Sequence, residues 1–337
     1  MPPINRQVLL KSRPSGIPLP EHFEIVDAAL PEIRDGQILV RNAYLSVEPA
    51  MRGWVSAVAN YSTPVGIGEV MRAYTVGRVV QSRHARYGEG DVVTGQLGWQ
   101  HYAVSDGRAI TRKVTEADLP LSLALGVLGQ NGITAYFGLT EAGNPRPGDT
   151  VVVSTAAGSV GSAVGQIAKI MGCRTVGIAG GPVKTQLCRD EFGYDAAIDY
   201  KAHGGIADAL AAACPRGVDV YYDNTSGPIS DQVMAQLAVG ARVVICGTAS
   251  VASWDPPPLG PRVERHLLVK RARMTGFLVF DYQHRYGEAV ARLAAWVRAG
   301  RIRAREDITD GIETCPGAIA GLYRGENLGK RLVRLPD

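Results

Sequence analysis

A glycine-rich stretch at residues 155–161, "TAAGSVG", directly follows the apolar run at 151–153. Its small residues at 156, 158 and 161 fit the dinucleotide-binding fingerprint G-x-G-x-x-G, with alanine in place of the first glycine. In this fingerprint the second glycine lets the backbone approach a pyrophosphate, and the third lets the helix pack closely on the strand. Backbone N–H groups at the start of the helix can then bind the phosphates. The predicted diphosphate site consists of Gly158, Ser159, Val160 and Gly161.

The segments around this turn favour a binding site over a purely structural turn. Apolar side chains recur through residues 160–171 at the spacing of one helix face, which predicts a helix. A second apolar run follows at 174–180, at the distance that the fingerprint requires. Small residues in a turn can also serve packing alone, and the motif by itself leaves that alternative open.

The end of the second predicted strand indicates which dinucleotide binds. An NAD site usually carries an acidic residue there, which binds the adenosine ribose 2′-hydroxyl. This chain instead has Gly180 and Gly181, followed by Lys184. Two glycines leave room for a 2′-phosphate and a lysine supplies positive charge, so the residues favour NADPH over NADH. The alternative is that Lys184 is a solvated lysine in the first turn of a helix.

The elements that position these residues alternate between strand and helix. Apolar runs after the glycine turn predict further strands at 196–199, 219–224, 242–247 and 274–280. Between and after them, helices are predicted at 183–192, 206–213, 230–238 and 286–300. This alternation is typical of an α/β fold with a doubly wound parallel sheet. We assign residues 123–300 to this Rossmann domain.

The N-terminal part has a different pattern. Short alternating runs at 37–47, 73–82, 91–97 and 99–104 are separated by Gly, Pro and Asp, which predicts a mostly β domain. We assign residues 1–122 to this domain and expect residues 301–337 to complete it, because that tail is too short to fold alone.

Composition narrows the function classes. The 337 residues carry a formal net charge of +4, and the basic residues are scattered, so we expect no nucleic-acid partner. No apolar run approaches the length of a membrane span, so we expect no membrane partner. The five cysteines are far apart and form no C-x-x-C pair, which indicates thiols in a reducing compartment. We therefore expect a cytoplasmic protein.

Several stretches, in this order, resemble one family: "YLSVEPAMRG" (44–53), "GVLGQNGITAYFGL" (126–139), "DNTSG" (223–227), "MTGFLVFD" (274–281) and "GENLGKRLVR" (325–334). They are similar to the zinc-independent medium-chain dehydrogenase/reductases, in the branch of the leukotriene B4 dehydrogenase/prostaglandin reductases and the bacterial NADPH-dependent curcumin reductases. The resemblance implies a GroES-like β domain beside the Rossmann domain, NADPH as cofactor and a homodimer.

The resemblance also implies roles for individual residues. Lys184 and Tyr200 would bind the 2′-phosphate end of NADPH, and Asn327 would reach back to the cofactor. Asn224 would lie at the C-terminal end of its strand, where ligands bind in such sheets, and Cys246 and Gly247 would line the cleft. Phe277, Leu278 and Val279 would border the nicotinamide.

The implied reaction is reduction of the carbon–carbon double bond of an enone or enal, with hydride transferred to the β-carbon. Negative charge then builds on the carbonyl oxygen, so the site needs a hydrogen-bond donor. Cysteine and histidine zinc ligands at suitable spacing are not visible, so we predict no metal. Tyr61 matches the tyrosine of the curcumin-reductase loop and is the candidate catalytic donor; alternatively, it is a surface-loop aromatic. The cofactor ribose 2′-hydroxyl is another candidate donor.

Three departures from the family pattern concern the substrate pocket. Ala50 and Ala252 stand where tyrosines are usual, which should enlarge the pocket. Gln130 and Asn131 stand where Met and Pro are common, and they add hydrogen-bonding groups. With Tyr61, these residues predict a broader or more polar substrate than a simple alkenal. A quinone reductase, a zinc-free alcohol dehydrogenase and a non-catalytic NADPH-binding sensor or interaction protein remain alternatives.

Overall fold

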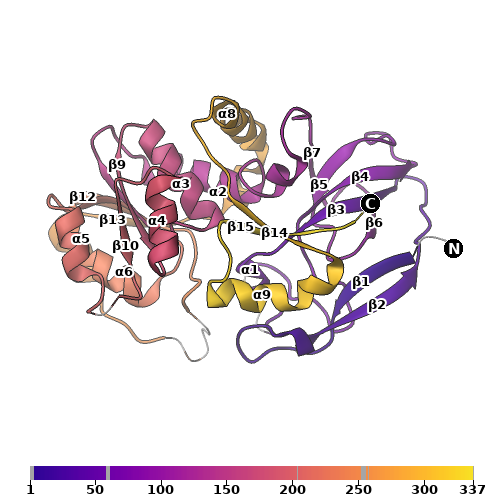
Figure 1. The fold of residues 1–337 in the computed structure, drawn as a ribbon, viewed down its shortest axis with the longest axis horizontal. Helices are drawn as coiled ribbons and strands as arrows, with labels where there is room; N and C mark the ends of the chain where they lie inside the picture. The colour runs from indigo at the N-terminus through magenta and orange to yellow at the C-terminus, as the bar shows by residue number, and fades with distance from the viewer. Residues whose placement is uncertain (1–3, 58–60, 203, 252–255, 257, 337) are drawn as a thin grey trace. The chain divides into compact units, whose positions relative to one another are not determined.

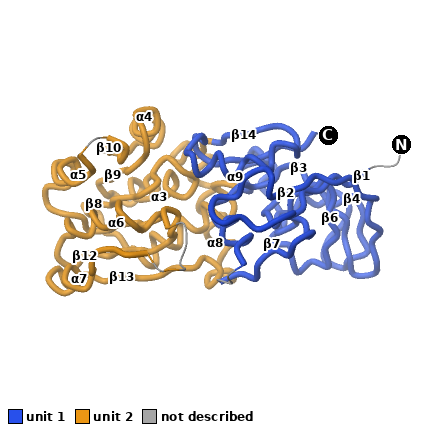
Figure 2. The backbone as a smooth tube through the Cα atoms, turned by 90° about the horizontal axis from the view of Figure 1, so that it is seen from below, with its two compact units in different colours: residues 1–125, 306–337 blue, residues 126–305 orange. Residues whose placement is uncertain are grey.

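The computed structural model describes residues 4–57, 61–202, 204–251, 256 and 258–336. The chain forms two compact units (Figure 2): unit 1 comprises residues 1–125 and 306–337, and unit 2 comprises residues 126–305. Each division lies a few residues beyond the domain boundary predicted from the sequence. The reason is local packing, because Leu125 belongs to the core of unit 1, whereas the backbone N–H of Arg303 donates to Gln166 of unit 2.

Unit 2 contains a six-stranded parallel sheet with the strand order β10-β9-β8-β11-β12-β13. The predicted doubly wound Rossmann sheet is therefore confirmed. The order reverses between β8 and β11, and this switch point is where ligands bind in such sheets. The strands are β8 (Thr150–Ser154), β9 (Arg174–Ala179), β10 (Ala196–Asp199), β11 (Val218–Asp223), β12 (Leu237–Ile245) and β13 (Arg273–Gly276).

Helices connect these strands and pack on the sheet (Figure 1). The helix after the glycine turn, α3 (Ser159–Ile170), buries Val164, Ile167 and Ala168 against β8 and β9, as the apolar spacing predicts. It ends before Gly172, whose φ of 81° is the left-handed conformation that glycine adopts easily. The other helices of unit 2 are α2 (Gln130–Phe137), α4 (Pro182–Asp190), α5 (Ala207–Ala213), α6 (Gly227–Met234), α7 (Glu264–Lys270) and α8 (Tyr286–Arg298).

Two predicted elements of unit 2 end earlier than expected. The strand predicted at 274–280 ends at Gly276, because residues 279–285 form the 3-10 helix η4 (Val279–Arg285). The helix predicted at 230–238 corresponds to α6, which ends at Met234, because β12 already begins at Leu237. In both places an apolar run continues past the end of an element, so hydrophobicity alone does not mark the boundary.

Unit 1 is mostly β structure. Its seven-stranded sheet has the order β14-β15-β3-β4-β5-β7, β6 also pairs with β3, and β1 and β2 form a separate antiparallel pair. The C-terminal strands, yellow in Figure 1, therefore lie in the same sheet as the strands near the N-terminus. The strands are β1 (Ile4–Leu10), β2 (Phe23–Ala29), β3 (Ile38–Ser46), β4 (Thr75–Ser82), β5 (Val92–Gly95), β6 (Tyr102–Ser105), β7 (Ile110–Lys113), β14 (Glu306–Asp310) and β15 (Lys330–Arg334).

The described part of unit 1 also contains two α-helices, α1 (Ala50–Trp54) and α9 (Cys315–Arg324). Met51 and Trp54 of α1 are buried in one core cluster with Trp99, Ile319 of α9 and Leu332 of β15. The cluster joins segments from both ends of the chain. The core of unit 1 therefore depends on residues far apart in the sequence.

Candidate functional site

The two glycines of the turn between β8 and α3 lie where a side chain would be crowded. A Cβ added at Gly161 would lie 2.2 Å from the carbonyl oxygen of Thr155, and one at Gly158 would lie 3.0 Å from the Thr155 side chain. Gly158 is the N-cap of α3, and no side chain caps the helix. The first N–H groups of a helix have no partner within it. The turn therefore has the open backbone donors that an anionic phosphate requires.

Both loops at the switch point contain a strained residue. Thr155 follows β8 with φ 55°, and Ser226 lies two residues beyond Asn224 with φ 57°. Non-glycine residues, and β-branched ones above all, rarely adopt this left-handed conformation. Such strain persists only where the surrounding contacts enforce it, and it is concentrated at functional sites.

A hydrogen-bonded network joins the ends of β8 and β11 across the switch point. The side chain of Asn224 donates from Nδ2 to the carbonyl oxygen of Ser154 (2.7 Å). The Ser154 hydroxyl accepts from the Asn224 backbone N–H (2.8 Å) and donates to Asp223 (3.2 Å). In the described chain the Asn224 Oδ1 has no partner, so it remains able to accept a hydrogen bond. Sequence reasoning selected Asn224 but missed Ser154 and Asp223, although Asp223 immediately precedes it in "DNTSG".

The glycine pair after β9 lies beside a tyrosine and an acidic residue. A Cβ at Gly180 would lie 2.8 Å from the Tyr200 hydroxyl oxygen, so the two residues are in close contact. Lys184 lies in the first turn of α4, and the structure places it in the same unit as Tyr200. Asp199, at the end of β10, was not predicted; its Oδ1 accepts from the Gly181 N–H (2.7 Å). This carboxylate therefore fixes the turn from the neighbouring strand.

The loop after β12 is fixed to the end of β11. The N–H groups of Cys246 and Gly247 both donate to the Asp223 carbonyl oxygen, at 2.9 and 3.1 Å. A Cβ at Gly247 would lie 2.9 Å from the Asn224 carbonyl oxygen. Burial raises the pKa of the Cys246 thiol to about 11, so the group is neutral near pH 7. Asn224, Cys246 and Gly247 thus form one compact surface.

The predicted nicotinamide border lies at the start of η4. Phe277 and Val279 are buried, and Leu278 is exposed. The Tyr286 hydroxyl donates to the Val279 carbonyl oxygen (3.3 Å) and accepts from Gln130 Nε2 (3.1 Å). The structure therefore links the predicted pocket residue Gln130 to the predicted cofactor border.

Asn131 lies beside Gln130 in the first turn of α2. Its Oδ1 is buried and has no hydrogen-bond partner among the described residues. Buried polar atoms are usually paired, so an unpaired one indicates a position where a ligand group can bind.

In unit 1, the segment that carries Tyr61 is held by two arginines. Arg72 donates to the Ser62 hydroxyl (2.6 Å) and the Thr63 carbonyl oxygen (2.8 Å). Arg13 donates to three carbonyl oxygens, among them that of Val65 (2.8 Å). Tyr61 itself is 56% exposed. The backbone on one side of Tyr61 is thus fixed, and its ring is accessible.

The remaining predicted residues have the following environments. Ala50 begins α1 and is partly buried against the unit 1 core. Asn327 is buried and donates from Nδ2 to the Gly329 carbonyl oxygen (2.7 Å), so its side chain shapes its own loop. Ala252 lies outside the described residues.

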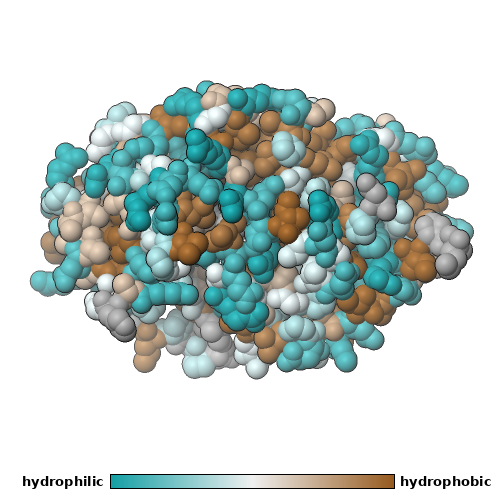
Figure 3. Space-filling model, viewed as in Figure 1, coloured by the Kyte–Doolittle hydropathy of each residue, from teal (hydrophilic) through white to brown (hydrophobic). Residues whose placement is uncertain are grey.

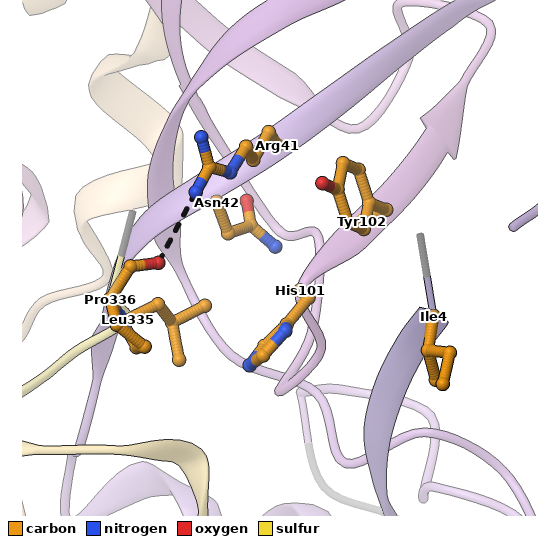
Figure 4. A pocket seen from close by; sticks show the side chains of 7 residues that line it. All are labelled: Ile4, Arg41, Asn42, His101, Tyr102, Leu335 and Pro336. Atoms are coloured by element: carbon orange, nitrogen blue, oxygen red, sulfur yellow. Dashed lines mark hydrogen bonds between the residues drawn. The ribbon is translucent and has the colours of Figure 1, made fainter. Parts of the chain in front are cut away.

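A separate cavity of about 220 Å³ lies in unit 1 (Figure 4). It contains none of the residues predicted for the site. Arg41 points across it and donates to the Pro336 carbonyl oxygen (3.3 Å). Burial, together with Arg6 and Arg41, lowers the pKa of His101. The residues that line the cavity are Ile4, Arg41, Asn42, His101, Tyr102, Leu335 and Pro336.

Other features of the described chain bear on the function class. Within it, no group of three or more His, Cys, Asp or Glu side chains is placed to hold a metal ion. None of its helices combines the length and hydrophobicity needed to cross a bilayer. The five cysteines are free thiols; four are buried, and Cys246 is partly buried. Hydrophilic side chains are spread over the surface of each unit in the view of Figure 3, with apolar ones between them.

Comparison with known proteins identifies the family. A family model described as the N-terminal domain of oxidoreductase matches residues 6–113, and one described as zinc-binding dehydrogenase matches residues 159–295. The chain is 42% identical to the NADPH-dependent curcumin reductase of Escherichia coli, over 98% of this chain and 97% of that protein. It is 35% identical to the NADP(+)-dependent 2-alkenal reductase of Nicotiana tabacum, over 98% of this chain and 97% of that protein.

A solved structure agrees with these sequence matches. The fold superposes on CurA from Vibrio vulnificus in complex with NADPH with a TM-score of 0.91 and 43% identity. The match covers 98% of this chain and 99% of that one. The chain therefore belongs to the medium-chain dehydrogenase/reductase family, in the branch of the prostaglandin reductases and the bacterial curcumin reductases.

Proposed function

We propose that this protein uses NADPH to reduce the carbon–carbon double bond of α,β-unsaturated carbonyl compounds. The observation that carries the proposal is the close-packed glycine turn at the start of α3, beside the switch point of a six-stranded parallel sheet. It occurs in a chain related over its whole length to a curcumin reductase and a 2-alkenal reductase. NADPH, when bound, supplies the hydride that is transferred to the β-carbon.

The residues of unit 2 fit this cofactor. The open N–H groups at the start of α3 would bind its diphosphate, because the turn admits no side chain there. Lys184 and Tyr200 would bind the 2′-phosphate by charge and hydrogen bonding. The side-chain Oδ1 of Asn224 would accept a hydrogen bond from the nicotinamide half, and Cys246 and Gly247 would line that half. By the family resemblance, Asn327 would also reach the cofactor.

Tyr61 would act on the substrate. Reduction at the β-carbon places negative charge on the carbonyl oxygen, and a hydroxyl group can stabilise that charge by donating a hydrogen bond. The arginine contacts at 62, 63 and 65 support this role, because they fix the backbone next to an accessible ring. In this proposal the reaction needs no zinc, since a hydroxyl group takes the place of a metal at the carbonyl oxygen.

The substrate would be an enone or enal with a polar or bulky group. Ala50 and Ala252 stand where the family pattern usually has tyrosines, and their smaller side chains would enlarge the pocket. The Asn131 Oδ1, buried and unpaired within the described chain, would bind a hydrogen-bond donor of the substrate. Gln130 would shape the same wall through its bond to Tyr286.

An edge strand and the free thiols bear on the oligomeric state and the cellular location of the protein. We infer a homodimer, because β13 ends the sheet of unit 2 and, among the described strands, pairs only with β12. An unpaired edge strand can pair with a second copy of the chain. We also infer a cytoplasmic location, because five free thiols suit a reducing compartment.

The test is an NADPH-oxidation screen with enones, enals, nitroalkenes and quinones, and the reverse assay with NADP+ and secondary alcohols. We expect enones and enals to be consumed and their saturated carbonyl products to be identified by mass spectrometry. Turnover of quinones or alcohols alone would assign one of those activities instead. Tight NADPH binding without any oxidation would indicate a non-catalytic role.

A further inference from the structure

Asp223 is a completely buried acidic residue at the end of β11, next to the switch point. One of its oxygens, Oδ1, collects an unusual number of hydrogen bonds. Two of the donors are backbone N–H groups, so this oxygen can only be an acceptor. The donors to Oδ1 are the Ser154 hydroxyl (3.2 Å), the Tyr221 hydroxyl (3.0 Å), the Thr225 N–H (2.9 Å), the Thr225 hydroxyl (3.2 Å) and the Ser226 N–H (2.9 Å).

The other oxygen of Asp223 has no such support. Oδ2 is buried and has no hydrogen-bond partner among the described residues, and in that part of the chain no cation pairs with Asp223. A buried charge without a counter-charge is unfavourable. Its presence at a ligand-binding edge therefore calls for a functional explanation.

The position of Asp223 relates it directly to the proposed cofactor site. Its carbonyl oxygen accepts from the N–H groups of Cys246 and Gly247, and its chain neighbour is Asn224. Ser154 bonds to both Asp223 and Asn224. Asp223 thus lies immediately behind three residues that would line the nicotinamide half, and it contributes a negative charge there.

We propose that Asp223 is a positioning residue whose negative charge makes the site favour the oxidised, positively charged nicotinamide over the neutral reduced form. This inference rests on the proposed NADPH function. A site that stabilises NADP+ relative to NADPH lowers the reduction potential of the bound cofactor. Bound NADPH then becomes a stronger hydride donor, because loss of hydride leaves positive charge on the ring.

The field of Asp223 reaches its neighbours in unit 2. Burial raises the pKa of Asp231 on α6, and the negative charge of Asp223 raises it further. A purely structural role, in which Asp223 only fixes the turn at 224–226, is the competing explanation. The two differ in one observable, since a structural role would alter the affinities for both cofactor forms alike.

The test compares dissociation constants for NADPH and NADP+, measured by isothermal titration calorimetry on the full chain. In Asp223→Asn we expect NADP+ binding to weaken about tenfold more than NADPH binding, the scale of one elementary charge acting through protein at an effective dielectric constant near 20. A tenfold change in the ratio of the NADP+ dissociation constant to the NADPH dissociation constant corresponds to about 30 mV in the reduction potential of the bound cofactor, a two-electron couple. Equal weakening of both forms would overturn the inference.

Asp219→Asn is the matched control, because Asp219 lies on the same strand and its Oδ2 accepts from the Thr150 N–H (2.8 Å) at the opposite end. It should leave the ratio unchanged, and a shift as large as that of Asp223→Asn would contradict the inference.

Tyr221→Phe covers the case in which Asp223→Asn fails to fold. It keeps the charge and removes one donor to Oδ1. The ratio of the NADP+ to the NADPH dissociation constant should therefore fall, whereas Asp223→Asn should raise it. An unchanged or a raised ratio in Tyr221→Phe would contradict the inference. If the wild-type chain binds neither form, the proposed function fails with it. If it binds both and the variants shift them equally, only the role of Asp223 fails.

Discussion

Gly161 and Thr155 approach each other so closely that a Cβ at position 161 would lie 2.2 Å from the Thr155 carbonyl oxygen. The turn cannot easily yield, because the Ala156 N–H donates to the Ile178 carbonyl oxygen (3.0 Å) and the Gly158 N–H donates to that of Thr155 (2.9 Å). The start of α3 is therefore locked onto the end of β8.

Gly161→Ala should damage both stability and cofactor binding. The added methyl group must displace backbone atoms, which we expect to lower the free energy of unfolding by about 1–3 kcal/mol. NADPH affinity should fall at least about tenfold, because the open N–H groups move with the turn. Urea denaturation followed by circular dichroism and a fluorescence titration with NADPH measure the two effects.

Gly287→Ala is its control, since a Cβ at Gly287 in α8 would meet no atom within 4 Å. We expect unchanged NADPH binding and equal or higher stability, by up to about 1 kcal/mol, because alanine favours helix. Normal NADPH binding by Gly161→Ala would show that the turn is structural only.

Lys184→Ala should weaken the binding of NADPH and leave that of NADH nearly unchanged. The lost charge-assisted contact with the 2′-phosphate is worth on the order of 1.5–3 kcal/mol. Lys169→Ala is the control, because Lys169 pairs with Asp195 (2.7 Å) and is not among the proposed cofactor residues. Dissociation constants for both cofactors decide the matter, and an equal loss for both would remove Lys184 from the phosphate site.

Tyr61→Phe should lower kcat for an enone while the dissociation constant of NADPH stays within about twofold. Removing one donor to the developing oxyanion costs about 10²–10³ in rate at other enzymes. Tyr102→Phe, in the separate cavity of unit 1, provides a tyrosine control that should keep full activity. Steady-state kinetics with a cofactor titration separate the two effects, and an unaffected kcat would exclude Tyr61 from the mechanism.

Gln130→Met should shift the substrate preference towards apolar enals. The change removes the donor to the Tyr286 hydroxyl, whose own bond to the Val279 carbonyl oxygen remains. Comparison of kcat/KM for a polar enone and an apolar enal measures the shift. Tyr286→Phe removes the same hydrogen bond but keeps the Gln130 amide. If the two variants have the same ratio of kcat/KM for the polar enone and the apolar enal, Gln130 acts only through Tyr286.

Glu306→Gln should change how stability depends on pH. Burial raises the pKa of Glu306 above its ordinary value of 4.5, against the opposing effects of Ser122 and Lys330. A raised pKa in the folded state means that stability is lost as the pH rises through that value. The variant cannot ionise, so its stability relative to wild type should increase as the pH rises from about 4.5, the ordinary pKa of glutamate.

Asp310→Asn, on the same strand β14, should show the opposite slope. The hydrogen bond from Arg334 lowers the pKa of Asp310, so wild type gains stability from this group as the pH rises, and the variant loses that gain. Urea midpoints at a series of pH values test both variants. Parallel slopes for the two would contradict the assignment for Glu306.

Local signals in the sequence were sufficient to predict much of unit 2. The glycine spacing at 156–161 and the alternating apolar runs predicted the parallel sheet and the turn, because both patterns arise from neighbouring residues. The predicted C-terminal end of β13 was wrong, because the apolar run at 277–280 leaves the sheet and continues into η4.

Contacts between distant segments could not be predicted in this way. The five donors on one oxygen of Asp223 come from β8, from β11 and from the 225–226 turn, and Ser154 of β8 is about seventy residues from the others in the chain. The arginine contacts beside Tyr61 start from residues 13 and 72 and likewise depend on the folded chain. The roles of Lys184, Tyr61 and Gln130 stay predictions, which the variants above test.

The order of strands in unit 1 has a consequence for synthesis on the ribosome. β15 pairs with β3, so the edge of β3 that receives it stays uncovered until nearly the whole chain has been made. Unit 2, whose residues are contiguous, can fold while the C-terminal segment is still in the exit tunnel. A nascent chain that stalls before residue 330 would therefore present an open sheet edge, a surface that chaperones protect from aggregation.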